Sequence, residues 1–335
     1  GDGYSITGTD SLNSAGVHVD GSSGSSLGNV SVTDLTVTDW ETGLYYDTSD
    51  DGTIRNVTAT SNVEYGIHIN EGTGHAIENS SFTDNNEAVY VFSSTTHTIT
   101  NNTFTGSGTG VRMILVQQVT AQNNAFEVTG PAFDIQDTGD IRFGNNTIVD
   151  GGRSTISGSD GPRNQITNNS FSQSAGMEID SAVDDLVANN TLTGGTAGVH
   201  IKSSEQIEFR NNSISDTSGT NSDDGLLVTE GSSHVIVDNN IENSDQSGIR
   251  LGTTQATLSG NTLSGNQYNL RVGDGGSWSS ISHTIDASNT VEGRPVAYHV
   301  NETDVTVDPN AGWVGVIGTE NATVADITFP ENNHE

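Results

Sequence analysis

The stretch NNTFTGSGTGVRM, residues 101–113, contains the two features that decide the fold. Its first four residues recur in closely similar form at 145–148, 168–171, 189–192 and 211–214. The recurring asparagines lie 21 to 28 residues apart, most often 22 or 23, and are Asn56, Asn79, Asn102, Asn124, Asn146, Asn169, Asn190, Asn212, Asn240 and Asn261. A fixed period of this length indicates a repeat architecture.

The second feature is a small residue followed by alternating apolar positions, Gly110-Val111-Arg112-Met113, which recurs at 66–69, 198–201 and 248–251. Alternation with period two indicates a strand, and we expect the glycine to supply the turn that opens it. Two or three such strands per 22 residues leave no room for a crossover helix. The chain must therefore coil, with each strand pairing in parallel with its counterpart about 4.8 Å away. The predicted fold is an all-β, right-handed parallel β-helix of about 12–13 coils.

Each recurring asparagine is expected at a turn where a left-handed backbone is tolerated, with its amide bonded to the equivalent amides above and below. The residue before it varies, so that position is expected to face solvent. The longest spacing, between Asn212 and Asn240, indicates an inserted loop at 216–224 that should project from the solenoid.

The composition restricts the classes of partner. Of 335 residues, 43 are acidic and 10 are basic, which gives a formal net charge of -33, and Lys202 is the sole lysine. Such a surface repels nucleic acids and anionic membranes. Because the acids are spread over a patterned chain, they indicate a halophilic surface protein of haloarchaeal type rather than disorder. Since the chain has no cysteine, its stability must come from the stacked repeats.

Localisation is expected to be extracellular, at the cell surface. No run approaches the roughly 20 apolar residues of a membrane span, so no direct membrane insertion is predicted. The opening residues Gly1-Asp2-Gly3 favour a mature or excised ectodomain.

The repeats at about 15–288 resemble the β-helix repeats of CASH-domain carbohydrate-binding proteins, polysaccharide lyases and archaeal surface proteins. The segments 289–300, 311–317 and 321–324 resemble the closing part of the NosD-like family. The resemblance implies that 1–288 is the repeat array and that 289–335 adds coils closing the same solenoid. It also implies a copper-handling role, although the chain has no cysteine, two methionines and nine scattered histidines, which departs from a copper site.

If the coils stack in register, the residue two places after each strand opening points outward, and these residues form one column on a single sheet. The predicted column is Tyr45, His68, Tyr90, Arg112, Asp134, Ser157, Glu178, His200, Leu227, Arg250 and Arg271. The next outward column contains Phe92, Asp180 and Lys202. Because bases and histidines are rare in this chain, their enrichment here makes this face the expected ligand surface.

Three interpretations of this face stay open. As a glycan groove, it offers Tyr45, Tyr90 and Phe92 as stacking platforms, with polar contacts from Arg112, Asp134, Glu178, His200 and Lys202. If the face is an active site, Asp134 and Glu178 suit inverting hydrolysis, because two coil spacings of about 4.8 Å would place them about 10 Å apart. Alternatively, Glu178, Asp180, His200 and Lys202 suit a lyase or epimerase. As a purely structural face, it would pair opposite charges across rungs.

Two kinds of modification or ion site are also expected. The weak calcium candidates are Asp47, Asp50, Asp51, Asp216, Asp223 and Asp224, with solvated loops as the alternative, and no other cofactor is expected. Among ten Asn-X-Ser/Thr sequons, those at Asn29, Asn301 and Asn321 are the best glycosylation candidates. Asn56 and Asn79 are expected in the ladder position, where an inward amide could not carry a glycan.

The expected function is that of a structural or adhesive surface β-helix with carbohydrate binding along one sheet face. A polysaccharide-active enzyme and a copper-handling protein are the alternatives. Expected partners are glycans or other envelope proteins, with end-to-end assembly, an appendage or virion fibre, or a larger parent chain as further possibilities.

Overall fold

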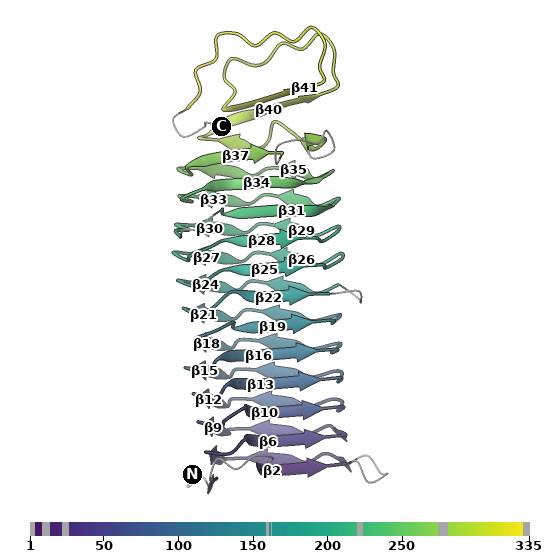
Figure 1. The fold of residues 1–335 in the computed structure, drawn as a ribbon, viewed down its shortest axis with the longest axis vertical. Helices are drawn as coiled ribbons and strands as arrows, with labels where there is room; N and C mark the ends of the chain where they lie inside the picture. The colour runs from purple at the N-terminus through teal and green to yellow at the C-terminus, as the bar shows by residue number, and fades with distance from the viewer. Residues whose placement is uncertain are drawn as a thin grey trace. The chain divides into compact units, whose positions relative to one another are not determined.

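A computed structural model describes residues 4–8, 14–21, 27–158, 161, 163–219, 224–273 and 281–330. The chain divides into two compact units, residues 1–175 (unit 1) and 176–335 (unit 2), each built of stacked coils (Figure 1). The described residues contain no α-helix, and no helix among them is long and apolar enough to cross a membrane. The architecture is a right-handed parallel β-solenoid of about 11 turns, which confirms the predicted fold class.

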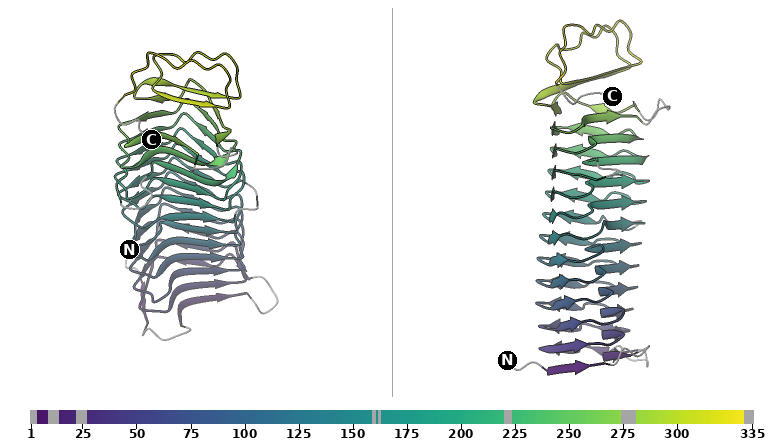
Figure 2. Two further views of the ribbon diagram at one scale, coloured as in Figure 1. Left: turned by 45° about the horizontal axis from the view of Figure 1, so that its top comes forward. Right: turned by 60° about the vertical axis from the view of Figure 1, so that its left-hand side comes forward.

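One coil consists of three strands separated by three turns, and each strand lies in a separate sheet. In unit 1, a typical coil runs through β6 (Thr42–Asp47), β8 (Thr53–Arg55) and β9 (Thr58–Thr60). We call the sheets that contain these strands the first, second and third sheets. Neighbouring strands in each sheet pair in parallel, and both views of Figure 2 show the coils of each unit lying one above another.

Among its described residues, unit 1 has seven strands in the first sheet and seven in the second. The first sheet contains β2 (Ala15–Asp20), β6, β10 (Tyr65–Asn70), β13 (Glu87–Phe92), β16 (Thr109–Ile114), β19 (Phe133–Gln136) and β22 (Ser154–Ser157). The second contains β4 (Ser31–Thr33), β8, β11 (Ala76–Glu78), β14 (Thr98–Thr100), β17 (Thr120–Gln122), β20 (Arg142–Gly144) and β23 (Gln165–Thr167).

The third sheet of unit 1 contains β1 (Tyr4–Thr7), β5 (Leu35–Thr38), β9, β12 (Ser81–Thr83), β15 (Thr103–Thr105), β18 (Ala125–Glu127), β21 (Thr147–Val149) and β24 (Ser170–Ser172). Two short strands, β3 (Leu27–Gly28) and β7 (Ser49–Asp50), pair at the turn between the first and second sheets.

Unit 2 repeats the same three-sheet plan. Its first sheet contains β25 (Met177–Asp180), β28 (Val199–Lys202), β31 (Leu226–Ser232), β34 (Ser247–Thr254) and β37 (Tyr268–Val272). Its second contains β26 (Leu186–Ala188), β29 (Glu208–Arg210), β32 (Val235–Val237), β35 (Thr257–Ser259) and β38 (Thr284–Ile285). Its third contains β27 (Thr191–Thr193), β30 (Ser213–Ser215), β33 (Asn240–Glu242), β36 (Thr262–Ser264) and β39 (Thr290–Val291).

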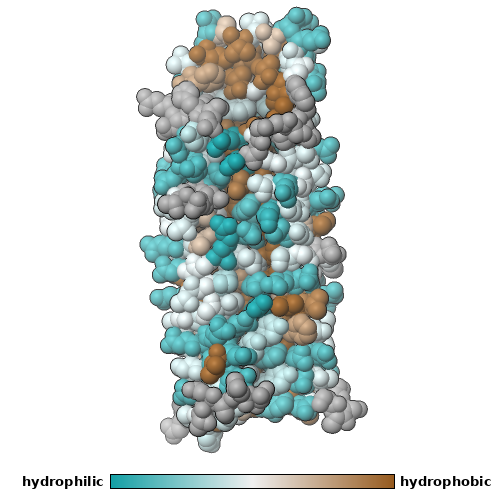
Figure 3. Space-filling view, in the orientation of Figure 1, coloured by the Kyte–Doolittle hydropathy of each residue, from teal (hydrophilic) through white to brown (hydrophobic). Residues whose placement is uncertain are grey.

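The chain changes direction after β39. Strand β40 (Arg294–Val300) pairs antiparallel with β39, and β41 (Trp313–Ile317) then pairs in parallel with β40. The reversal falls at Glu292 and Gly293, both with positive φ. Within unit 2, apolar side chains gather over β40 and β41 in the space-filling view of Figure 3, and the strand β41 is only half-buried. We call residues 294–330 the cap.

The asparagine ladder occupies the turn between the second and third sheets. In unit 1 the Asn124 backbone N–H and Nδ2 both donate to Oδ1 of Asn146, at 2.9 and 3.0 Å. The Nδ2 group of Asn124 contacts the carbonyl of Ile99 at 2.9 Å as well. The ladder residue itself is buried, and the positive φ belongs to the residue before it, such as Asn101 or Asn123. A planar amide can satisfy several backbone groups at once, which explains the recurrence of asparagine.

Three predicted ladder positions are wrong. Asn56 and Asn79 are exposed with positive φ, and Val57 and Ser80 take the buried positions. In unit 2, Asn239 rather than Asn240 is in the ladder, where it accepts from the Asn212 backbone N–H at 2.9 Å. The sequence pattern could not separate the two positions because both favour asparagine, one for its amide and the other for its tolerance of a left-handed backbone.

The strand-opening glycines also have a different role from the one expected. Neither Gly66 nor Gly110 has a positive φ. Instead, a Cβ atom added to either would lie 2.5 Å from a backbone oxygen, that of Ala88 or Ala132, in the next coil. A small residue is needed here because adjacent coils approach closely.

The core is continuous within each unit because inward positions stack on like positions. In the third sheet of unit 1, Phe104 stacks on Phe82 and Phe126 with ring centroids 5.0 and 4.5 Å apart. Each of these rings is at most 1% exposed. Burial of such side chains contributes roughly 1.5–3 kcal/mol each. The core is thus built from the inward side chains, and the outward side chains of the first sheet do not pack in it.

Candidate functional site

The outward column of unit 1 follows the predicted register over five rungs. His68 pairs with Tyr45 and Tyr90, and Arg112 pairs with Tyr90 and Asp134. His18 extends the column below Tyr45. The assignment of Ser157 to this column is wrong, because Thr155 lies opposite Asp134 and Ser157 lies opposite Gln136. Buried Ser154 takes the first inward position of β22, a position that an apolar residue occupies in other coils.

Aromatic rings stack along this column. Tyr45 lies between His18 and His68 with ring centroids 4.8 Å from each, and His68 lies 4.9 Å from Tyr90. Since neighbouring rings cover both faces of Tyr45, this residue does not fit the predicted platform on which a sugar would stack. It presents its edge and its hydroxyl to a ligand. Along the column, such polar edges recur at the rung spacing of about 4.8 Å.

Tyr65 is a site residue that the sequence analysis missed. Its ring stacks on Tyr90 at 5.1 Å and leans over His68 at 4.9 Å. Strict alternation would send Tyr65 inward, but Gly66 and Ile67 are both buried, so Tyr65 and His68 share the outer face. The break in alternation at the glycine hides this third outward column, in which Thr42, Tyr65 and Glu87 are in register.

These residues border an open groove of about 500 Å³ on β2, β6 and β10. The rings of His18, Tyr45, Tyr65 and His68 line it together with two carboxylates, Glu41 and Glu64. A volume of this size, with aromatic walls and a few polar groups, is typical of small-molecule sites. In the orientation of Figure 3 the strands of the first sheet lie in front.

The titratable groups of the groove are neutral rings beside anions. Burial lowers the pKa of His68 to about 4, and the Asp47 carboxylate opposes this shift. Burial, followed by Glu87 and Glu64, raises the pKa of Tyr65 to about 12. At neutral pH the His68 imidazole and the Tyr65 phenol are therefore uncharged, and both can exchange hydrogen bonds with hydroxyl groups.

Arg112 is held by its neighbours on adjacent rungs. Its Nη1 lies 2.8 Å from Glu87 Oε1, its Nε lies 3.4 Å from Asp134 Oδ2, and its guanidinium lies 6.0 Å from the Tyr90 ring centre. Asp134 in turn accepts from the Thr155 hydroxyl at 2.7 Å. This network closes the upper side of the aromatic column in unit 1.

The predicted site residues of unit 2 also lie on consecutive rungs. Glu178, His200, Leu227, Arg250 and Arg271 are in register. His200 bridges a carboxylate and a hydroxyl, with Nδ1 3.5 Å from Glu178 Oε2 and Nε2 2.8 Å from Thr229 Oγ1. Thr229 lies in the next outward column, opposite Lys202, but is not among the predicted site residues. The predicted carboxylate pair, Asp134 and Glu178, belongs to separate units, and each member has partners within its own unit.

Two further ionic residues of the unit 2 face, Asp180 and Lys202, pair with each other. Lys202 Nζ lies 2.9 Å from Asp180 Oδ2. Burial raises the pKa of Asp180, but the hydrogen bond from Lys202 and further contacts lower it below its ordinary value. The guanidinium of Arg271 lies 5.2 Å from the ring centre of Tyr268.

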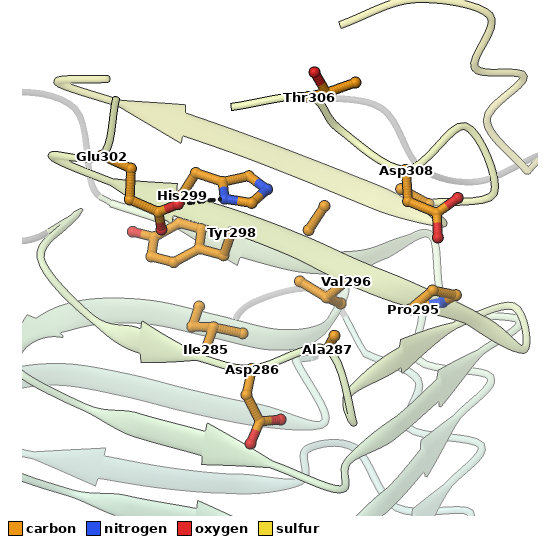
Figure 4. A pocket seen from close by; sticks show the side chains of 12 residues that line it. Ile285, Asp286, Ala287, Pro295, Val296, Tyr298, His299, Glu302, Thr306 and Asp308 are labelled. Carbon is orange, nitrogen blue, oxygen red and sulfur yellow. Dashed lines mark hydrogen bonds and ion pairs between the residues drawn. The ribbon is translucent and has the colours of Figure 1, made fainter. Parts of the chain in front are cut away.

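A second cavity, of about 370 Å³, lies inside unit 2 between β38 and the cap (Figure 4). His299 and Glu302 pair across 3.0 Å at one side. The other two carboxylates, Asp286 and Asp308, accept backbone N–H groups two residues further along the chain, at 3.0 and 2.8 Å. Those carboxylates stabilise turns, so the cavity offers mainly apolar walls and one imidazole–carboxylate pair.

Three of the predicted calcium ligands have structural partners. Asp47 accepts from Asn70 Nδ2 at 2.8 Å, Asp216 from Asn243 Nδ2 at 3.0 Å, and buried Asp224 from the Ser247 N–H at 2.9 Å. Residues 220–223, which include Asp223 and part of the inserted loop, lie outside the described residues. In the part of the chain that the structure describes, no three or more His, Asp or Glu side chains form a group that could hold a metal ion.

The sequon asparagines have exposed side chains. Asn29, Asn301 and Asn321 are exposed with positive φ. The same holds for Asn56 and Asn79, so the expectation that an inward amide prevents glycosylation there is wrong.

Comparison with known proteins agrees with the β-helix fold. The family described as a right handed beta helix region matches residues 15–171 and 156–311. The A-module of the mannuronan C-5 epimerase AlgE6 from Azotobacter vinelandii is similar in structure, with a TM-score of 0.55 and 16% identity over 87% of this chain and 79% of that one. The catalytic domain of a GH87 α-1,3-glucanase gives 0.51 and 13% over 86% and 63%. At these identities the likeness concerns the fold. A search of curated proteins by sequence finds no match.

Proposed function

Because the chain belongs to the right-handed β-helix family, we propose that it is a carbohydrate-binding β-helix whose ligand occupies the unit 1 groove. The observation that carries this proposal is the 500 Å³ groove in which Tyr45, His68 and Tyr65 expose polar edges beside Glu41 and Glu64. A sugar has alternating hydroxyl and C–H surface, and this groove offers both hydrogen-bonding edges and ring carbon. The rung spacing of about 4.8 Å is comparable to the length of one sugar unit in an extended polysaccharide.

The similar structures support a carbohydrate ligand in a general way. One is named as a mannuronan epimerase and another as a glucanase. We take from them only that this fold can present a groove to a long glycan. The structural or adhesive role and the choice of sugar rest on the residues of this chain.

The proposal extends to the setting in which the protein works. An extracellular position at the surface of a halophile is supported by the net charge of -33 and the exposed sequon asparagines. We propose further that the closing segment is NosD-like. We also propose that the chain contacts other envelope proteins and that copies of it can associate end to end.

The first prediction concerns the phenol hydroxyls of the groove. We expect Tyr45→Phe and Tyr65→Phe each to weaken glycan binding by about three- to tenfold, since one hydrogen bond contributes roughly 0.5–1.5 kcal/mol. Titration calorimetry with a panel of oligosaccharides measures this change. The matched control is Tyr268→Phe in unit 2, whose ring contacts Arg271 and which should leave affinity unchanged.

The same samples distinguish binding from catalysis. If no oligosaccharide of the panel binds, or if neither groove variant alters the affinity, the proposal is wrong. Appearance of product during the titrations, lost in His200→Ala, would instead favour the enzyme alternative, with His200 between Glu178 and Thr229 as the base.

A further inference from the structure

Carboxylates surround the unit 1 groove. Glu41 and Glu64 line it on adjacent rungs, where the Glu64 N–H donates to the Glu41 carbonyl at 2.9 Å. Asp47 lies on the same outer face next to Tyr45. None of the described residues that line the groove is a lysine or arginine. The cation on this face, Arg112, is engaged by Glu87 and Asp134.

Nearby carboxylates affect the pKa values of the two phenol groups, Tyr45 and Tyr65. After burial, the causes that raise the pKa of Tyr45 are the Asp47 and Asp20 carboxylates. For Tyr65 they are Glu87 and Glu64, and Arg112 opposes them. Both hydroxyls, which come from neighbouring strands, therefore lie in a negative field that disfavours a second negative charge. His68 adds no positive charge at neutral pH, because its pKa lies at about 4.

We propose that the groove recognises amino sugars, with a protonated amine of the glycan placed against Glu41 and Glu64. This proposal rests on the proposed function, since it names the sugar class for the same groove. The ring hydroxyls meet the edges of Tyr45, Tyr65 and His68, and the ammonium group meets the carboxylates. A uronic acid would instead bring a carboxylate into a field of the same sign, on a chain whose net charge is already -33.

The test compares three oligosaccharides of equal length: a glucosamine oligomer, its N-acetylated counterpart and a mannuronate oligomer. Titration is performed on the full chain with EDTA present, below the pKa of the amine and in molar salt, which screens unspecific attraction between a cation and an acidic protein. We expect the glucosamine oligomer to bind about tenfold more tightly than the N-acetylated one, and the mannuronate oligomer to bind most weakly.

Variants of Glu41 and Glu64 test whether these two carboxylates cause the preference for a charged amine. We expect Glu41→Gln and Glu64→Gln each to lower the affinity for the glucosamine oligomer by about two- to fivefold, because an exposed ion pair contributes little. Because both residues line the groove, the affinity for the N-acetylated oligomer can change too, but it should fall less than the affinity for the glucosamine oligomer in each variant. The control Glu127→Gln removes an exposed carboxylate from β18 in the third sheet and should change nothing.

Each outcome is informative. Equal affinity for the N-acetylated oligomer, or tighter binding of mannuronate, overturns the amino-sugar assignment while the proposed function stands. An oligolysine of equal charge that binds as tightly, with the same loss in Glu41→Gln and Glu64→Gln, overturns it also, because the groove would then attract any cation. Absence of binding by all three sugars removes the proposed function and this assignment together.

Discussion

The histidines that face the core show how a single residue links hydrogen bonding to pH. His97 and His234 are buried, and the Nδ1 atom of each accepts a backbone N–H from the preceding coil, from His75 at 3.1 Å and from Ile207 at 3.3 Å. An imidazole can accept in this way only when that nitrogen carries no proton. Burial accordingly lowers the pKa of His97 to about 3, with His75 adding to the effect, and that of His234 to about 4.

This arrangement predicts a loss of stability in mild acid. An unfolded histidine has a pKa of about 6.5, so the unfolded chain binds protons between about pH 6.5 and 4 that the folded chain does not bind. The free energy of unfolding must therefore fall as pH falls through this window, by roughly 3 kcal/mol for His234 once the pH is below 4. Chemical denaturation at a series of pH values between 7 and 4 measures the slope.

The variant His97→Asn separates titration from packing. Asn164 already fills the equivalent position in another coil of unit 1, where its Oδ1 accepts from the Ile141 N–H at 3.0 Å. We expect His97→Asn to fold and to show a shallower dependence of stability on pH. A slope unchanged in His97→Asn would show that the buried imidazole does not carry the effect.

At the scale of the coil, stability depends on contacts that pass from one turn to the next. In unit 1 the ladder asparagine bonds to both neighbouring coils, since Asn124 Oδ1 accepts two bonds from Asn102 at 2.9 and 3.1 Å and its Nδ2 donates to Asn146 at 3.0 Å. Each buried group left without a partner costs about 1–3 kcal/mol. A single ladder position therefore influences three coils.

The corresponding prediction compares two substitutions of Asn124. We expect Asn124→Ala to lower the free energy of unfolding by about 3 kcal/mol, because it orphans the two donors of Asn102 and the carbonyl of Ile99. Asn124→Ser should cost about half as much, since Ser80 already acts as an acceptor at an equivalent position, from the Val57 N–H at 3.1 Å. Equilibrium unfolding monitored by circular dichroism measures both. An equal loss in exposed Thr103→Ala would argue against a ladder effect.

The elements could be predicted from the sequence because successive repeats carry the same pattern of strands and turns. The period and the parallel pairing follow from the repeat, and the outward positions of Tyr45, His68 and Arg112 follow from alternation. Two kinds of position could not be predicted correctly from the sequence. Asn239 shows that a motif with two adjacent asparagines does not reveal which one is buried, and Asn56 shows that a single asparagine can take the exposed turn position while the next residue, Val57, is buried. Tyr65 faces outward because Gly66 and Ile67 are both inward, a local break that only the close approach of neighbouring coils explains.

At the scale of the whole chain, charge is the dominant property. With 43 acidic and 10 basic residues, exposed carboxylates repel each other throughout the surface, whereas most of the buried side chains in the described core are apolar. The screening length falls from about 10 Å at 0.1 M salt to about 3 Å at 1 M. Molar salt should therefore remove most of the repulsion between acids on separate rungs.

This leads to a prediction about salt. The midpoint of thermal unfolding should rise as KCl increases from about 0.1 M to above 1 M, because the repulsion acts mainly in the compact state. Differential scanning calorimetry measures the midpoint. A variant with three exposed acids converted to amides, Glu127→Gln, Asp150→Asn and Asp245→Asn, should be more stable at low salt and gain less from KCl. A flat response in the original chain would contradict the halophilic setting.

The separation of inward from outward positions in the first sheet has an evolutionary consequence. Leu44 and Tyr46 fill the core while Tyr45, between them in sequence, belongs to the groove. Selection for ligand specificity can therefore act on one set of codons while selection for folding acts on the set interleaved with it. Duplication of a whole coil would lengthen the binding surface by one rung, about 4.8 Å, without any redesign of the interior. New specificities can arise in such a protein by point changes or by adding length.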